Sequence, residues 1–496
     1  MNFAQTAKTS AQIKTTENGA MAYNTTTNAL LDLFAQIGAL RPRSEGEIEM
    51  KYADAYAVNP ELATKMLFYA GNIRGGLGER RTFRICLRWL AINHPIVVRD
   101  NLANIPHFNR WDSLFVLVGT PVEFEMWNYI RDQLNLDMQA VIKEKNGGKH
   151  AGISLLAKWM PTETAHAKET RTLAKTAMRK LGVTPRQYRK MLSALRAHLK
   201  VVESLMSAGK WDEVEYPAVP SYAMKNYRKA FGAHDKVRFG EYIASLNKGE
   251  VKINVSTLFP YDLVHQYMTG RNFYYGTTID SIIEAQWKAL PNYIEGENNI
   301  LVMADVSGSM MGRPMETSIG LATYFAQRNI GDYHGLYMTF TDRPHFIDIS
   351  RETTLAGCIN KVNNTDVGYS TNLDRAFEYV LNHAIEHHIT NEDMPKALVV
   401  ISDREIDPYF RGRRNMDFVQ KWVAEFARFG YTCPKLVMWN VEARNDTFLS
   451  QSDDVVIVSG QSVSTFHNLC QSLGGKTAWD FMCEVLNDPM YDCVVI

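Results

Sequence analysis

Cysteines are few in this sequence, and they are widely scattered. They form no C-x-x-C pair and no ladder of short spacings, which disfavours both a zinc site and a disulfide scaffold. No apolar run approaches the length of about 18 residues that a membrane span needs, and the N-terminus does not resemble a signal peptide. We therefore expect a cytoplasmic protein with reduced thiols and no membrane partner. The cysteines are Cys86, Cys358, Cys433, Cys470, Cys483 and Cys493.

The sequence also lacks a net charge, because 54 Lys and Arg residues balance 54 Asp and Glu residues. This balance conceals an asymmetry between the two parts of the chain. Residues 297–496 carry 16 Lys and Arg against 26 Asp and Glu, which leaves 38 against 28 for residues 1–296. A basic half favours a nucleic acid or another polyanion as its partner.

The common catalytic motifs are missing as well. The sequence contains no nucleophile elbow, kinase signature, Walker motif or dinucleotide fingerprint, so we expect no enzymatic activity. The glycine-rich segment 71–81 lacks the Gly-Lys-Ser/Thr of a phosphate loop and lies between predicted helices. We expect a tight interhelical turn there, in which glycine supplies backbone conformations that other residues rarely adopt. An RNA-facing role stays open for the arginines at its rim, Arg74, Arg80 and Arg81.

The letters of a zinc-peptidase motif, His-x-x-Glu-His, do occur at residues 383–387. The apolar residues of this segment recur with helical spacing, which places His383 and His387 largely on the solvent side of an amphipathic helix. No third ligand is assigned. A metallohydrolase is therefore a disfavoured third hypothesis, and it predicts bound zinc.

The length of 496 residues predicts two domains. Residues 1–20 are polar and predict a flexible tail. Residues 21–296 predict a mostly helical, basic domain, and its helix pairs favour a stacked helical-repeat arrangement. Apolar residues recur at three- and four-residue spacing in the segments 29–39, 60–69, 80–92, 155–159, 164–181, 185–206 and 221–231.

From residue 297 the pattern changes to apolar strands that alternate with helices. Strands are expected at 300–304, 335–340, 397–402, 435–441 and 455–459, with helices at 315–328 and 373–388 among them. This alternation predicts an α/β domain over residues 297–496, built on a doubly wound parallel sheet.

A cluster of oxygen-bearing side chains lies in the turn that is expected after the first of these strands. Asp305, Ser307 and Ser309 follow the apolar run and surround Gly308. Loops at the carboxyl ends of parallel strands are where open α/β sheets bind ligands. The cluster therefore predicts a metal-binding loop.

Two further residues complete the predicted metal site. Thr371 directly precedes an amphipathic helix, and Asp403 ends another apolar strand. The resulting set offers only oxygen ligands, which suit Mg²⁺ or another hard divalent cation such as Mn²⁺. Waters would fill the remaining positions, one of which could receive an acidic group of a partner protein. The alternative is a metal-free domain in which the Ser and Thr side chains cap helix starts.

The order Asp-x-Ser-x-Ser, then Thr, then Asp resembles the metal-ion-dependent adhesion site (MIDAS) of von Willebrand factor A (vWA) domains. The resemblance rests on Asp305, Ser307, Ser309, Thr371 and Asp403. It implies the vWA fold and a cation that these residues bind.

A helical region joined to such a domain is similar to the TROVE family of Ro ribonucleoproteins. That resemblance implies helical repeats that close into a ring, single-stranded RNA ends in the hole of the ring and structured RNAs on its outer surface. Over nearly the full length, the chain resembles a family of phage and plant proteins whose function is not settled. The resemblance rests on residues 16–20, 73–81, 110–114, 155–161, 188–193 and 252–254.

A dense basic run marks the helical region. Between residues 166 and 200 the only acid is Glu169, against ten Lys and Arg residues. Arg171, Lys175 and Arg179 follow one another at four-residue steps, so they share a helix face that could follow a phosphate backbone. The alternative is a solvated face that offsets the acidic domain. The ten residues are Lys168, Arg171, Lys175, Arg179, Lys180, Arg186, Arg189, Lys190, Arg196 and Lys200.

Together these patterns predict a non-enzymatic, Mg²⁺-dependent binding protein. Its basic helical domain would bind RNA, as in a ribonucleoprotein, and its vWA-like domain would bind an acidic group of a partner through the metal. The alternative is a protein–protein scaffold or virion-associated component that binds no nucleic acid.

Overall fold

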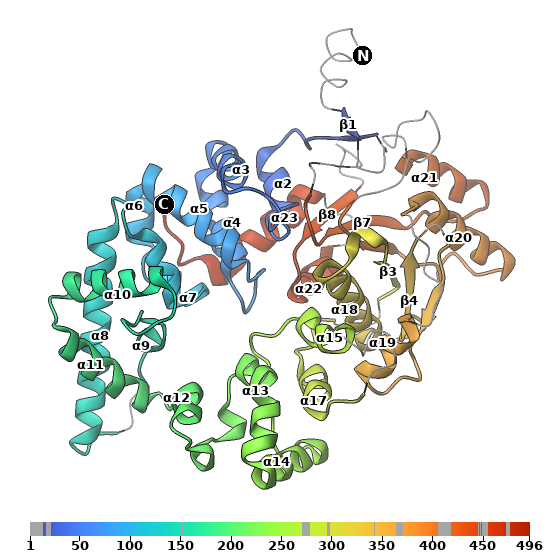
Figure 1. The fold of residues 1–496 in the computed structure, drawn as a ribbon. Coiled ribbons are helices and arrows are strands. Elements are labelled where there is room, and N and C mark those ends of the chain that lie inside the picture. Colours follow the sequence, from blue (N-terminus) through green and yellow to red (C-terminus); the bar gives the residue numbers. More distant parts are fainter. Residues whose placement is uncertain are drawn as a thin grey trace.

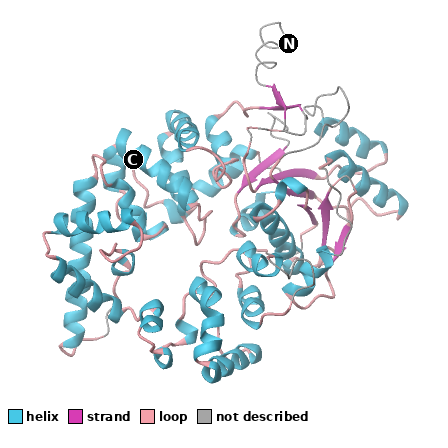
Figure 2. Ribbon diagram, in the orientation of Figure 1, coloured by secondary structure: helices cyan, strands magenta, loops and turns pink. Residues whose placement is uncertain are grey.

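The computed structural model describes residues 13–15, 21–149, 152–269, 278–294, 298–341, 343–363, 371–404, 418–444, 446, 448, 455–472 and 477–496. It contains a helical region followed by an α/β region built on a mostly parallel sheet (Figure 1, Figure 2). This confirms the predicted fold class. Among the described residues, no helix is both long and apolar enough to cross a membrane.

The helical region runs from residue 29 to residue 289. It consists of α2 (Ala29–Phe34), α3 (Glu45–Val58), α4 (Pro60–Gly71), α5 (Arg80–Asn93), α6 (Pro95–Asp100), α7 (Asn104–Phe108), η1 (Trp111–Leu117), α8 (Glu123–Lys145), α9 (Leu156–Trp159), α10 (Lys168–Leu181), α11 (Pro185–His198), α12 (Val202–Ser207), η2 (Trp211–Glu213), η3 (Tyr216–Ala218), α13 (Ser221–His234), α14 (Lys236–Lys248), α15 (Pro260–Met268) and α17 (Ser281–Ala289).

Most of the predicted helices occur where the apolar spacing places them. The prediction of one helix over residues 185–206 is wrong, because the chain turns between α11 and α12. Lys200 lies in this turn with a φ of 47°, a left-handed conformation that ends the helical hydrogen bonding. Apolar spacing continues across the turn, so it did not reveal the break.

The sheet of the α/β region has the strand order β5-β4-β3-β6-β7-β8. All strand pairs are parallel except β4 with β5, which is antiparallel. The short edge strand β5 was missed by the sequence prediction, whereas the other five strands were expected. The strands are β3 (Ile300–Asp305), β4 (Leu336–Phe340), β5 (Phe346–Asp348), β6 (Ala397–Ser402), β7 (Lys435–Asn440) and β8 (Val455–Ser459).

Helices cover both faces of this sheet, so its central strands are buried on both sides. Alternate residues of β3 point to opposite faces: Val302 packs in one hydrophobic cluster and Met303 in the other. The first face is covered by α18 (Arg313–Arg328), α19 (Leu355–Asn363) and α22 (Ser464–Ser472), and the second by α20 (Leu373–Glu386) and α21 (Phe418–Arg428). The parallel strands with helices on both faces are a doubly wound arrangement.

The C-terminal segment leaves the sheet and packs against the start of the helical region. Helix α23 (Ala478–Leu486) and the turn η6 (Pro489–Tyr491) contact α4. The buried ring of Tyr491 lies 5.3 Å from the ring of Phe108 and 6.3 Å from that of Tyr69, measured between centroids. Its hydroxyl accepts a hydrogen bond from the Asn72 side chain at 3.2 Å. We call this contact the first seam.

The last helices of the helical region pack against the other end of the α/β region. Helix α15 lies along α18, and Gly320 permits the close approach, because a Cβ at that position would lie 3.1 Å from the Cβ of Pro260. Glu284 of α17 accepts hydrogen bonds from the amides of Leu355 and Ala356, at 2.7 and 3.0 Å, and so caps α19. We call this contact the second seam.

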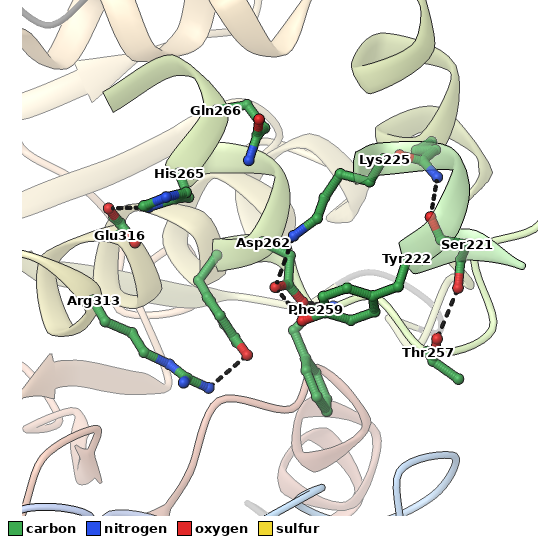
Figure 3. A network of polar contacts seen from close by, with 12 residues as sticks. Ser221, Tyr222, Lys225, Thr257, Phe259, Asp262, His265, Gln266, Arg313 and Glu316 are labelled. Atoms are coloured by element: carbon green, nitrogen blue, oxygen red, sulfur yellow. Dashed lines mark hydrogen bonds and ion pairs between the residues drawn. The ribbon is translucent and has the colours of Figure 1, made fainter. Parts of the chain in front are cut away.

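A buried polar network supports the second seam (Figure 3). The Asp262 carboxylate accepts hydrogen bonds from the Tyr222 hydroxyl and the Phe259 amide, and it forms an ion pair with Lys225 at 3.3 Å. Nearby, Nδ1 of His265 lies 2.7 Å from Oε1 of Glu316 on α18. The network thus fixes α13 and α15 to each other and to the α/β region.

The two seams make the helical region an arc that begins and ends on the α/β region (Figure 1). One continuous hydrophobic cluster includes Leu67 of α4, Val302 of the sheet and Leu486 near the C-terminus. The predicted boundary near residue 297 therefore marks a change of architecture, and this one cluster extends across it.

Part of the segment expected to be a flexible tail forms a strand. β1 (Ile13–Thr15) pairs antiparallel with β2 (Met21–Tyr23), and Tyr23 forms a bridge with Phe448. The rest of residues 1–20 lies outside the described residues.

Replacing Tyr491 by Ala should lower the free energy of unfolding by about 3 to 5 kcal/mol, because it removes a buried ring from the first seam. Urea denaturation followed by circular dichroism measures the change. Val495, whose side chain is 45% exposed, provides the control. V495A should change the free energy by less than about 0.5 kcal/mol, and a Y491A variant as stable as wild type would contradict the seam.

Candidate functional site

The candidate metal site lies at the carboxyl edge of the sheet, between β3 and β6. These two strands are neighbours in the sheet although they are far apart in the chain. From β3 the chain builds outward in one direction through β4 and β5, and it then returns to the other side of β3 to form β6, β7 and β8. The gap between β3 and β6 is therefore the point where the strand order reverses, which is where open α/β sheets bind ligands.

Four of the five predicted ligands lie around this point. Asp305 is the last residue of β3, and its Oδ1 accepts a hydrogen bond from the Ser307 amide at 2.9 Å. The hydroxyls of Ser307 and Ser309 lie 3.2 Å apart. Asp403 directly follows β6, and its charge acts on Asp305.

The fifth predicted ligand, Thr371, is buried at the start of α20. Helix α20 ends at Glu386, and ten residues separate it from the amino end of β6. Its last turn is therefore at the amino edge of the sheet, and its first turn is at the carboxyl edge, on the same side as Asp305. Whether Thr371 contacts a cation stays a prediction.

Both carboxylates of the site are buried, Asp305 completely and Asp403 with 2% of its surface exposed. Burial and the nearby charge of Asp403 raise the pKa of Asp305 to about 7, against the opposing effect of hydrogen bonds from Ser307 and Ser402. Two ionised carboxylates at one buried place repel each other. A divalent cation between them would relieve this repulsion, and the carboxylate and hydroxyl oxygens suit Mg²⁺ or Mn²⁺.

Sequence reasoning missed two residues that position this site. The Ser402 hydroxyl donates a hydrogen bond to Oδ2 of Asp305 at 2.5 Å and accepts one from the Arg404 amide at 3.0 Å. The Arg444 guanidinium donates to the Ser309 carbonyl at 2.6 Å and pairs with Glu442. Ser402 could have been found from its place at the end of a parallel strand, whereas the sequence carries no signal for Arg444.

Two arginines lie in the chain directly beside the candidate ligands. Arg404 is buried, has a φ of 66°, and lies with its guanidinium 4.9 Å from the ring of Phe448. Arg313 begins α18 directly after the candidate metal-binding loop, and its guanidinium donates a hydrogen bond to the Gln461 side chain. Together with Arg444, they place three arginines next to the candidate ligands in the chain or in space.

The His-x-x-Glu-His segment lies on α20. The rings of His383 and His387 are 4.4 Å apart, and burial together with His387 lowers the pKa of His383. Within the described part of the chain, no group of three or more His, Cys, Asp or Glu side chains is placed to hold a metal. The described residues therefore offer no support for the zinc-hydrolase hypothesis.

The predicted basic run divides into two groups. One group is occupied by internal contacts: Arg189 pairs with Glu163, Lys200 with Glu215 at 2.9 Å and Lys180 with Glu123 at 3.0 Å. In the same group, the guanidiniums of Arg171 and Arg196 donate hydrogen bonds to backbone carbonyls.

The second group is exposed, and no carboxylate within 4.0 Å pairs with its members among the residues that the structure describes. We call it the α10–α11 face. Figure 1 places α10 and α11 beside α8, on the side of the molecule away from the sheet. The face consists of Lys168, Lys175, Arg179, Arg186 and Lys190.

The glycine-rich segment forms the expected turn between α4 and α5. Gly78 has a φ of 65°, and a Cβ on Gly76 would lie 2.1 Å from the Tyr69 carbonyl oxygen, so only glycine fits there. Arg74 donates to the His107 carbonyl at 3.3 Å, and Arg81 donates to the Arg43 carbonyl at 2.9 Å. Arg80 lies exposed at the start of α5.

Comparison with known proteins finds two domain models of unknown function. DUF2828 matches residues 16–110 and 168–299, and DUF7788 matches residues 299–473. The two matches meet at the change from helices to strands. The chain is also similar to an uncharacterized protein of Acanthamoeba polyphaga mimivirus, with 28% identity over 491 residues that cover 91% of this chain and 83% of that protein.

In metal-free protein, the raised pKa of Asp305 should make stability fall as the pH rises. Between its ordinary value of 3.8 and about 7, the folded protein keeps a proton that the unfolded chain has released. The free energy of unfolding therefore decreases through this window. Urea denaturation in EDTA at pH 5 and pH 8 should show a larger loss for wild type than for Asp305→Asn. Equal losses in the two proteins would contradict the raised pKa.

Proposed function

We propose that this protein is a non-enzymatic binding protein with two separate contact regions. Its α/β region holds Mg²⁺ or Mn²⁺ through Asp305, Ser307, Ser309, Thr371 and Asp403. Its helical arc contacts RNA through basic side chains. The observation that carries the proposal is the convergence of two buried carboxylates and two serine hydroxyls at the point where the strand order reverses.

The strand order supports a vWA-like reading of the α/β region. Counted from β3 as the first strand, the sheet has the order 3-2-1-4-5-6 with an antiparallel third strand at its edge. The candidate ligands follow the first strand, precede α20 and follow the fourth strand. This is the arrangement that the MIDAS resemblance implies.

The surround of the site favours an acidic partner group. The cation would bring two positive charges, and Arg313 and the first turn of α18 lie directly after the loop that holds it. A helix N-terminus carries unpaired amides and a partial positive charge. A carboxylate from a partner protein could then complete the coordination of the metal, and Met311, which is 76% exposed beside the loop, offers it an apolar neighbour.

The α10–α11 face supports the RNA contact. Its cations lie at steps of seven and four residues on α10 and of four residues on α11, and both helices pack against α8. They form a positive surface without competing carboxylates in pairing distance among the described residues. Such a surface binds phosphates with little sequence preference and with strong dependence on salt. Arg74, Arg80 and Arg81 would extend the contact along the arc. The TROVE resemblance points to the same partner.

One observation favours the alternative, a protein–protein scaffold or virion-associated component without nucleic acid. Several predicted RNA contacts, including Arg189, Arg196 and Lys200, are used within the protein. The basic excess of the arc is thus partly structural. Nucleic acid that co-purifies with the protein would favour the RNA proposal, and its absence after a low-salt purification would favour the scaffold.

Mg²⁺ or Mn²⁺ should raise the thermal unfolding temperature of wild type and leave that of Asp403→Asn unchanged. A cation at 100 times its dissociation constant adds about 2.7 kcal/mol to the free energy of unfolding. Asp332→Asn, at an exposed position of the same region, provides the control and should respond as wild type does. A cation effect that survives in Asp403→Asn would place the metal elsewhere.

Replacing Lys168, Lys175 and Arg179 together by Gln should weaken binding of single-stranded RNA. Each lost phosphate contact should also reduce the slope of log affinity against log salt by about 0.7. Filter binding over a salt series measures both effects. Lys210→Gln with Lys248→Gln, at exposed cations that have carboxylate partners, is the control. An unchanged slope in the triple variant would remove the α10–α11 face from the proposal.

A further inference from the structure

A cavity in the helical arc has the composition of a ligand site. Its volume is about 410 Å³, within the range of roughly 300 to 1,000 Å³ that small-molecule pockets occupy. It lies between α3, α5 and η1, and none of its residues belongs to the candidate metal site. It is lined by Glu45, Glu49, Arg80, Arg81, Arg84, Ile85, Arg88 and Val116.

One wall of the cavity is a row of guanidiniums. Arg80, Arg84 and Arg88 follow one another at four-residue steps on α5, so they share one face of the helix. Arg81 completes the wall, and α5 contains no acidic residue. Planar guanidiniums with several donors each are well suited to bind phosphate oxygens.

The arginines of this wall are largely held in place before any ligand binds. Arg84 donates to Oδ2 of Asp112 at 2.8 Å, and Arg88 donates to the carbonyls of Val116 and Val118 at 3.0 and 3.2 Å. Each guanidinium has five N–H donors, so donors remain for a ligand. A wall that is already ordered loses little conformational entropy on binding.

Arg80 has no hydrogen bond or ion pair with any residue that the structure describes. Although Arg80 is exposed at the surface, desolvation of its guanidinium and the nearby Arg110 charge lower its pKa, against the opposing effect of Tyr222 and Asp112. An anion in the cavity would add a favourable charge interaction at this wall. The site therefore favours a ligand with a negative group at the α5 wall.

The opposite wall is acidic. Glu45 and Glu49 lie one helical turn apart on α3, and within the described structure neither forms an ion pair with the arginines across the cavity. A polyanion that filled the cavity would meet these carboxylates and be repelled. A ligand with one phosphoryl group at one end and hydrogen-bond donors at the other matches both walls, and Ile85 and Val116 offer apolar surface to a ring between them.

We propose that this cavity binds a nucleoside monophosphate, with its phosphoryl group on the arginines of α5 and the donor edge of its base on Glu45 and Glu49. Guanine fits best among the common bases, because its N1–H and amino group can donate side by side to one carboxylate. The inference requires neither the metal nor the RNA contact of the α10–α11 face. The nucleotide could be free or could be the phosphorylated 5′ end of an RNA.

Isothermal titration calorimetry of the full chain with guanosine 5′-monophosphate tests the proposal. We expect guanosine, which lacks the phosphoryl group, to bind at least tenfold more weakly, since a charge-assisted contact contributes about that factor. Arg80→Gln should weaken binding of the monophosphate by roughly the same factor. Lys175→Gln, on the α10–α11 face, should leave its affinity unchanged, and thermal unfolding should show both variants folded.

A second variant tests the sign of the electrostatic argument. Glu49→Gln removes a negative charge from the cavity, so it should strengthen binding of inorganic phosphate while Arg80→Gln weakens it. A merely structural role for these side chains would not move the two affinities in opposite directions. Affinity for the monophosphate that is unchanged in Arg80→Gln, equal affinity for guanosine, or no binding at millimolar concentration would overturn the proposal.

The source of the nucleotide is distinguished by competition. If a 5′-phosphorylated oligoribonucleotide displaces the monophosphate and its unphosphorylated form does not, the site takes RNA ends. If neither displaces it, the site takes the free nucleotide. Loss of RNA binding in the α10–α11 variant with unchanged nucleotide binding would show that the two proposals stand or fall separately.

Discussion

The two seams, at which the helical arc packs against the α/β region, are the constraint that holds the molecule together. At the first seam the buried ring of Tyr491 packs against α4 and its neighbours, and at the second α15 lies along α18. The same cluster continues from α4 through the sheet to the C-terminal segment, so one hydrophobic core spans both regions beside the smaller cluster that each region also contains. The arc is therefore fixed at both ends, and its middle, from α8 to α14, extends away from the sheet (Figure 1).

The candidate metal site follows from a different constraint, the parallel pairing of β3 with β6. This pairing places Asp305 beside Ser402 and Asp403 and buries both carboxylates. A core would normally exclude two like charges, or pair each with a cation. Their presence at the point where the strand order reverses is thus an unfavourable arrangement for folding alone. The divalent cation that we propose would offset the repulsion between the two carboxylates.

The net charges of the two halves do not describe the local distribution of charge within each of them. Part of the basic excess of the arc is used internally, as in the pair of Arg189 with Glu163, and part forms the α10–α11 face. A third part lines the cavity beside α5. Conversely, the acidic α/β region has arginines close to the candidate metal site: Arg404 follows Asp403 in the chain, and Arg444 contacts the Ser309 carbonyl. Each of these places has its own local balance of positive and negative side chains, and this balance determines which ligands it can bind.

The sequence by itself determined the local structure and the ligand types. Apolar runs of five or six residues predicted the buried strands, and helical spacing predicted most helices. The position of Asp305 at the end of a strand did not depend on the order of the strands in the sheet. Only the tertiary structure decided that β6 lies beside β3, that β5 closes the edge antiparallel, and that residues 477–496 pack against α4. It also decided which arginines are used in internal hydrogen bonds and ion pairs and which are exposed. The spacing of apolar residues indicates which side of each segment is buried, whereas strand order and the packing of the C-terminal segment depend on the fit between surfaces that lie far apart in the sequence.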